Sequence, residues 1–192
     1  MLETSRLILR AARRTHAASL FKEYTGRDDA SRFLQRGAHP SQTRTEAVID
    51  AWGESNWQVG NRFVWSILHR PDEQPIGLFL MFVDGSCAEI HYGLGPASWG
   101  QGLATEAGIS VMDWVMKQSS LSEVSTSCAT AHTASLRVLE KIGLRRIELL
   151  PGGLLQTSPG IRMDAWLYSW KRTAGFRAPG DTDEAFFEVR PL

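Results

Sequence analysis

The sequence predicts a mixed α/β (α+β) protein built as a single domain. Segments with the two-residue period of strands alternate along the chain with segments of helical spacing, and glycine and proline separate them. The clearest case is residues 87–94, where apolar and polar positions alternate before a glycine-rich turn and a long apolar helix. With 192 residues, 43% of them hydrophobic, the chain can fold around one core without disulfides or metals.

The first half of the chain predicts two helices and three strands. Leu7 and Leu9 alternate with polar neighbours as a short first strand, and Thr15 is placed to cap a helix that runs to Phe21. A second helix is expected over residues 45–57. Two apolar and aromatic segments then follow, separated by a turn-like stretch, and are predicted to pair as antiparallel strands, at residues 62–69 and 76–83.

The second half predicts a strand over residues 87–94 and a long helix over residues 102–118. This helix has one polar stripe on an otherwise apolar cylinder, so most of it should be buried. The rest of the domain is predicted as a strand, a helix ended by Gly143 and a hairpin, over residues 123–130, 133–142, 144–150 and 162–170. We expect residues 1–172 to form the domain and residues 173–192 to form a polar C-terminal extension.

Composition excludes several classes of partner. Lysine and arginine total 21, as do aspartate and glutamate, so net charge predicts neither nucleic acid nor a membrane as partner. No apolar run approaches the ~18 residues of a membrane span, and charges interrupt the N-terminus where a signal peptide would be apolar. Cys87 and Cys128 have no ligand spacing, so we expect no metal site and a reducing, cytoplasmic location.

The most informative stretch is the turn Trp99-Gly100-Gln101-Gly102-Leu103-Ala104-Thr105, between a predicted strand and a buried helix. Glycines there let backbone N–H groups point outward, and a helix N-terminus adds about half a positive charge. This arrangement suits a pyrophosphate, although such turns also open helices for structural reasons alone. The turn is neither a P-loop nor a Rossmann turn, which argues against nucleotide hydrolysis and dinucleotide redox chemistry.

Four segments occur in the order and at the separations of one known family. They are residues 3–10 (ETSRLILR), 88–92 (AEIHY), 99–107 (WGQGLATEA) and 135–144 (SLRVLEKIGL). Together they resemble the GNAT superfamily of acetyltransferases, in particular its RimJ/RimL-type branch, which includes N-terminal acetyltransferases of ribosomal proteins. The resemblance spans residues 2–172 and implies the GNAT fold, a mixed central sheet of about seven strands flanked by about four helices.

The resemblance implies that acetyl-coenzyme A (acetyl-CoA) is the acyl donor. The strand that ends at Leu94 would hydrogen-bond its pantetheine arm, and the amides of the glycine turn would hold its pyrophosphate. The implied donor-binding residues are Tyr92, Leu94, Trp99, Gln101, Gly102, Leu103, Ala104, Thr105 and His132. Two of them depart from the family pattern: Trp99 stands where glutamine or arginine is usual, and His132 replaces the asparagine of Asn-x-x-Ser.

Three residues are candidates for catalysis. Glu89 and His91 project from the same face of one predicted strand, and either can take the proton of an ammonium group before attack, although such a face can also simply meet water. The matched motif carries glutamate, which favours Glu89. The tyrosine that many GNAT enzymes use as general acid would fall at Leu139, so Ser135, one helical turn earlier, is the implied substitute.

The resemblance therefore implies an N-acetyltransferase in which a primary amine attacks the thioester directly. Two acceptor classes stay open, a protein or peptide N-terminus and a small amine, and Trp52 and Trp57 on the second helix are candidates for a wall of the acceptor site. The alternative is a CoA-binding regulatory or interaction module with little or no turnover, prompted by His132 and the missing tyrosine. Whether the protein forms a homodimer also stays open.

Overall fold

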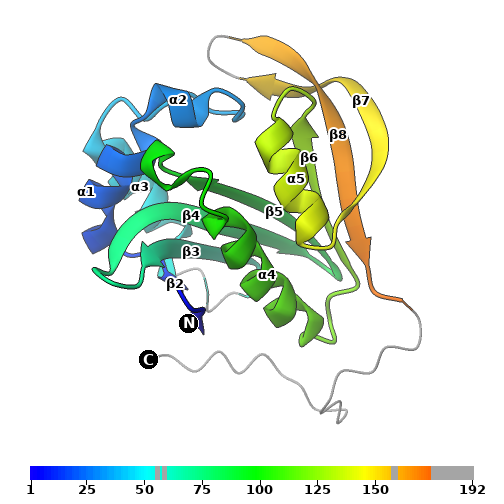
Figure 1. The fold of residues 1–192 in the computed structure, drawn as a ribbon, viewed down its shortest axis with the longest axis horizontal. Coiled ribbons are helices and arrows are strands. Elements are labelled where there is room, and N and C mark those ends of the chain that lie inside the picture. The colour runs from blue at the N-terminus through cyan, green and yellow to red at the C-terminus, as the bar shows by residue number, and fades with distance from the viewer. Residues whose placement is uncertain (55–56, 58–59, 157–159, 174–192) are drawn as a thin grey trace.

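The computed structural model describes residues 1–54, 57, 60–156 and 160–173 and shows an α/β fold around one eight-stranded sheet (Figure 1). The strands lie in the order β1-β2-β3-β4-β5-β6-β8-β7. Every neighbouring pair is antiparallel except β5 and β6, which are parallel. Their bounds are β1 (Leu2–Glu3), β2 (Leu7–Ala11), β3 (Arg62–His69), β4 (Gln74–Asp84), β5 (Cys87–Leu94), β6 (Glu123–Ala129), β7 (Arg145–Gln156) and β8 (Ile161–Lys171).

Helical segments cover both faces of this sheet. They are η1 (Arg14–His16), α1 (Ala17–Leu20), η2 (Phe21–Thr25), α2 (Asp28–Ser31), α3 (Gln42–Trp52), η4 (Pro96–Ser98), α4 (Leu103–Met116) and α5 (Thr133–Lys141). In Figure 1, α1 to α3 gather on the left and α4 and α5 lie in front of the sheet. Because α4 connects β5 to the parallel strand β6, the chain between these strands must cross one face of the sheet.

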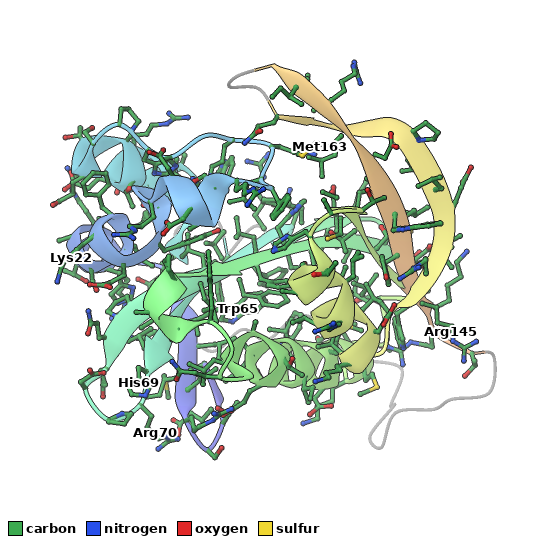
Figure 2. All side chains as sticks on the ribbon, turned by 45° about the horizontal axis from the view of Figure 1, so that its top comes forward. Lys22, Trp65, His69, Arg70, Arg145 and Met163 are labelled. Atoms are coloured by element: carbon green, nitrogen blue, oxygen red, sulfur yellow. The ribbon has the colours of Figure 1, made fainter. Side chains whose placement is uncertain are left out.

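Each face has its own buried core. On the side that we call the α4/α5 face, the core includes Trp65, Phe79 and Val111, and Figure 2 shows Trp65 at the centre of the molecule. On the opposite side, which we call the α1/α3 face, Leu20 and Ile49 pack with strand residues of the sheet. Side chains alternate between the faces along each strand, so neighbouring residues of β5 point to opposite faces, and Ala88, Ile90 and Leu94 belong to the core of the α4/α5 face.

The local patterns predicted most of these elements. The strands over residues 62–69 and 87–94 are confirmed with the same bounds, and the expected sheet of about seven strands has eight, because the two-residue β1 was not predicted. The predicted tail lies, beyond Thr173, outside the described residues. The closing hairpin is longer than expected, because a register shift between Leu150 and Leu154 keeps the glycine- and proline-containing segment within β7.

Two helix boundaries were predicted wrongly. The second helix does not run over residues 45–57: it starts at Gln42, where Ser41 caps the amide of Arg44 at 3.3 Å, and it ends at Trp52. Gly53 stops it, since a Cβ at Gly53 would collide with two backbone carbonyl oxygens. The first helical segment starts at Arg14, so Thr15 lies inside it and does not cap it.

Candidate active site

The two central strands of the sheet separate after only a few residues. Strand β5 pairs with β6 from Cys87 to Glu89, whereas its pairing with β4 continues to Leu94. From Ile90 onward, one edge of β5 has no strand partner among the described residues. The GNAT resemblance implies strands that separate after Leu94, and here they separate already after Glu89. A free strand edge exposes N–H and C=O groups that can bind an extended amide-containing ligand.

The glycine turn lies directly beyond this free edge. Gly100 and Gly102 have φ of 72° and 77°, the left-handed region that side chains rarely adopt. Gly102 also caps α4, and none of the described residues accepts a hydrogen bond from the amides of Leu103, Ala104 or Thr105. Unpaired amides at a helix N-terminus can hold an anion, so the turn has the geometry that the predicted pyrophosphate site requires.

Trp99 and Gln101 support the turn through their side chains. The Trp99 indole N–H donates to the Leu94 carbonyl at 2.8 Å, and the Gln101 amide donates to the Ala97 carbonyl at 2.8 Å. Trp99 thereby fastens the turn to the end of β5, which accounts for an aromatic residue at a position where the family usually has glutamine or arginine. The predicted donor-binding residues of the turn are thus brought together with Leu94.

A hydroxyl pair links β5 to α5 on the α4/α5 face. The Tyr92 hydroxyl lies 2.8 Å from Ser135 Oγ and 3.1 Å from the Ser135 carbonyl oxygen. Burial raises the pKa of Tyr92, so this phenol stays protonated at physiological pH. Leu139, at the position of the family's tyrosine, is 1% exposed in the core. Tyr92 and Ser135 therefore place two hydroxyl groups where β5 faces the start of α5.

Glu89 and His91 form a second pair, on the α1/α3 face. Their Oε1 and Nε2 atoms are 3.1 Å apart. The hydrogen bond from His91 lowers the pKa of Glu89 against the opposing effect of burial, so this carboxylate is ionised at neutral pH. A carboxylate that accepts one ring N–H leaves the other imidazole nitrogen as an acceptor, which is the arrangement of a general base with an orienting partner.

Aromatic contacts place Trp52 on the same face as this pair. The Phe82 ring lies 5.9 Å from His91 and 5.7 Å from Trp52, measured between ring centroids. Trp57 is different, since it packs on Phe63 and Trp65 in the core of the α4/α5 face. The structure therefore brings one of the two predicted tryptophans to the side of Glu89 and His91, and leaves Trp57 on the other side of the sheet.

His132 contacts a residue that the sequence analysis did not single out. Its ring stacks on Phe33 with centroids 4.6 Å apart and an interplanar angle of 21°. The segment around Phe33 is also tied to the hairpin, because Gln156 Nε2 donates to the carbonyl oxygens of Ser31 and Arg32. Burial lowers the pKa of His132, so the stacked ring is neutral at neutral pH. The sequence predicts that two loops, residues 31–42 and 151–159, shape the acceptor pocket, and the position of Phe33 in the first of them was the one signal that pointed to it.

Neither a metal site nor a membrane span is found in the described part of the chain. No group of three or more His, Cys, Asp or Glu side chains is arranged to hold a metal ion among these residues. None of the described helices is long and apolar enough to cross a bilayer.

Comparisons with known proteins identify the fold and the family. An acetyltransferase of the GNAT family from Bacillus anthracis is 19% identical with a TM-score of 0.74, over 88% of this chain and 97% of that one. A Salmonella typhimurium acetyltransferase that modifies the N-terminal serine of ribosomal protein L7/L12 is 17% identical, with a TM-score of 0.77, over 88% and 97%. Spermidine N-acetyltransferase from Vibrio cholerae, solved with CoA and spermine, is 15% identical with a TM-score of 0.73, over 88% and 96%.

These likenesses show that the fold is that of the GNAT acetyltransferases. A search of curated proteins gives no significant match. Residues 6–145 match the family described as "Acetyltransferase (GNAT) domain". The chain therefore belongs to the GNAT acetyltransferase family, as its sequence motifs predicted.

Proposed function

We propose that this protein is an N-acetyltransferase that takes the acetyl group from acetyl-CoA and transfers it to the α-amine of a peptide N-terminus. The observation that carries the donor half is the row of unpaired amides at Leu103, Ala104 and Thr105, next to the free edge of β5. A pyrophosphate fits these amides, and a pantetheine arm with two amide groups fits a strand edge.

The two polar pairs supply the groups that amine acetylation needs. His91, oriented by Glu89, takes the proton of the incoming ammonium directly or through water. The neutral nitrogen then forms its bond to the acetyl carbon while the carbon–sulfur bond breaks, and the nitrogen loses its second proton to water. Ser135, with Tyr92 as its hydrogen-bond partner, donates to the departing thiolate. The pairs lie on opposite faces of the sheet, and β5 leaves β6 between them.

Charge in the predicted acceptor segments favours a peptide over a polyamine. The segment of residues 31–42 contains Arg32 and Arg36 and no acidic residue, and residues 151–159 carry no charge. Neither arginine is ion-paired with a described carboxylate. A polyamine carries several positive charges and would be repelled, whereas a peptide N-terminus carries one. A cytoplasmic location belongs to the same proposal, and the free thiols of Cys87 and Cys128 support it.

A thiol-release assay with acetyl-CoA tests the proposal. We expect turnover with short peptides that have a free N-terminus, none with the same peptides formylated at that position, and little with spermidine. Spermidine as the preferred acceptor would refute the peptide assignment but not the acetyltransferase activity. Tight calorimetric binding of CoA without turnover on any amine would favour the alternative of a CoA-binding interaction module.

A further inference from the structure

The N-terminal segment before β2 contacts the glycine turn through Arg6. The Arg6 Nη1 atom donates to the carbonyl oxygen of Gln101 at 2.9 Å. The Arg6 Nε and Nη2 atoms each lie 2.6 Å from Glu106 Oε2, in the first turn of α4. One guanidinium thus bridges the turn and the helix that the turn opens, a two-point contact that the planar fork of arginine allows.

The contact with Gln101 determines which way the next amide points. In a trans peptide, C=O and N–H point in opposite directions, so a carbonyl held by Arg6 directs the Gly102 N–H away from Arg6. No described residue accepts a hydrogen bond from that N–H. Gly100 and Gly102 both have positive φ, and glycine crosses φ/ψ space easily, so this peptide needs an external contact to keep one orientation.

Glu106 is a firm anchor for Arg6. Its carboxylate also accepts hydrogen bonds from the hydroxyls of Thr4 and Ser5 and from the Arg6 amide, at 2.6, 3.2 and 3.0 Å. Burial opposes ionisation of Glu106, but the bonds from Thr4 and Arg6 outweigh it and lower its pKa, so the carboxylate is charged at neutral pH. Because Glu106 already balances its charge, Arg6 acts on the turn through hydrogen bonds more than as a free cation.

The pocket beside this network does not compete for the phosphate. It has a volume of about 490 Å³ and is lined by Arg6, Gly102 and α4. Three carboxylates also line it, those of Glu3, Glu106 and Asp113, and they would repel a pyrophosphate. The anion is therefore expected on the amide side of the turn.

We infer that Arg6 is a positioning residue of the donor site: by holding the Gln101 carbonyl against Glu106, it presents the Gly102 amide to the pyrophosphate of acetyl-CoA. This inference rests on the proposed function. It predicts that loss of Arg6 weakens the use of donors with a pyrophosphate and leaves donors without one unaffected.

The test compares acetyl-CoA with S-acetylpantetheine, which lacks the pyrophosphate, in wild type and Arg6→Ala. We expect kcat/KM for acetyl-CoA to fall about tenfold, through KM, because one fixed hydrogen bond to a charged donor is lost. With S-acetylpantetheine, kcat/KM should not change. We expect Arg6→Lys to fold even if Arg6→Ala does not. Because one ammonium cannot make both contacts, its kcat/KM for acetyl-CoA should lie between the values of wild type and Arg6→Ala.

Arg70→Ala is the matched control. Arg70 fastens the same N-terminal segment by donating to Glu3 at 2.6 Å and to the Thr4 carbonyl at 3.1 Å, and Figure 2 shows it at that end of the molecule. None of the hydrogen bonds that Arg70 makes within the described part of the chain involves the turn. We expect both donors to keep wild-type kinetics in Arg70→Ala. Three outcomes would each overturn the inference. They are an equal loss with both donors in Arg6→Ala, a selective loss with acetyl-CoA in Arg70→Ala, and full activity with acetyl-CoA in Arg6→Lys. Wild type inactive with acetyl-CoA would instead refute the proposed function.

Discussion

Replacing His91 by alanine tests the proposed chemical step most directly. The His91 and Glu89 side chains are 37% and 54% exposed, and a solvent-screened pair of this kind adds little to stability. The variant should therefore fold normally, so a change in rate can be assigned to chemistry. We expect a loss in kcat/KM that is large at low pH and small at high pH. At high pH the acceptor ammonium loses its proton to water, so the reaction no longer depends on a base in the enzyme.

The size of the loss follows from how much acceptor is already neutral. A peptide α-amine has a pKa of about 7.8, so roughly 5% of it is neutral near pH 6.5 and roughly 90% near pH 8.8. Without its base, the enzyme depends on that fraction, so we expect about a 20-fold loss near pH 6.5 and less than about twofold near pH 8.8. An alkyl amine of pKa about 10.4 would still show a loss of roughly 40-fold near pH 8.8.

The assay is the pH profile of kcat/KM for thiol release with a peptide acceptor. His69→Ala is the matched control, since His69 is another half-exposed histidine beside a carboxylate, 3.3 Å from Asp72, and lies at the end of β3 (Figure 2), a strand that does not pair with β5. Glu89→Gln should show a smaller loss than His91→Ala with the same dependence on pH. A His91→Ala profile parallel to wild type at every pH would show that the base lies elsewhere.

Four further outcomes are expected. Gly102→Val should abolish CoA binding by calorimetry, because φ of 77° is strained for valine and its side chain would press on the Arg6 guanidinium, 3.7 Å from a Cβ at this position. Ser135→Ala should lower kcat by less than His91→Ala does, nearly independently of pH, since a thiolate of pKa about 8.5 already leaves readily. Trp52→Ala should raise the acceptor KM in steady-state assays, whereas Trp57→Ala should chiefly lower Tm, because only Trp52 shares the face of His91. Burial lowers the pKa of His39 from 6.5 to about 4. The free energy of unfolding, measured in urea, should therefore be highest above pH 6.5 and decrease as the pH falls toward 4, and the decrease should be smaller in His39→Gln. The control for backbone strain at Gly102 is Gly60→Val, since Gly60 has a similar φ of 74° and no close neighbour. Unchanged CoA affinity in a folded Gly102→Val protein would contradict the proposed position of the donor site.

The parts of the site that depend on local sequence were predictable. The glycine turn follows from Gly100 and Gly102, whose conformations only glycine adopts easily, and the shared face of Glu89 and His91 follows from the two-residue period of a strand. In both cases the residues that interact are close in the chain, so no knowledge of the remaining fold is needed.

The parts that depend on distant contacts were not predictable. Nothing in the sequence around Phe33 indicates that it meets His132, about a hundred residues later, because the contact depends on how the segment after α2 lies against the residue before α5. Trp52 and Trp57 look alike in sequence, and only the stop at Gly53 sends them to different faces. Arg6 lies in the first of the four family-like segments, but the sequence assigns it no role, since its partners follow some hundred residues later.

Two of the three departures from the family pattern, those at His132 and Leu139, are compensated by residues on other elements. At His132 the ring offers Phe33 a flat surface that an asparagine would lack, and Gln156 holds the segment of Phe33 to the hairpin, so the proposed donor side and the proposed acceptor side are connected. At Leu139 a core side chain replaces the tyrosine, but Tyr92 brings a phenol from β5 to within 2.8 Å of Ser135 Oγ. An interaction module that had lost turnover would have no need for an ordered hydroxyl pair on one face and an ionised Glu89 beside His91 on the other. The presence of both pairs, where β5 leaves β6, therefore supports the catalytic proposal over the binding-module alternative.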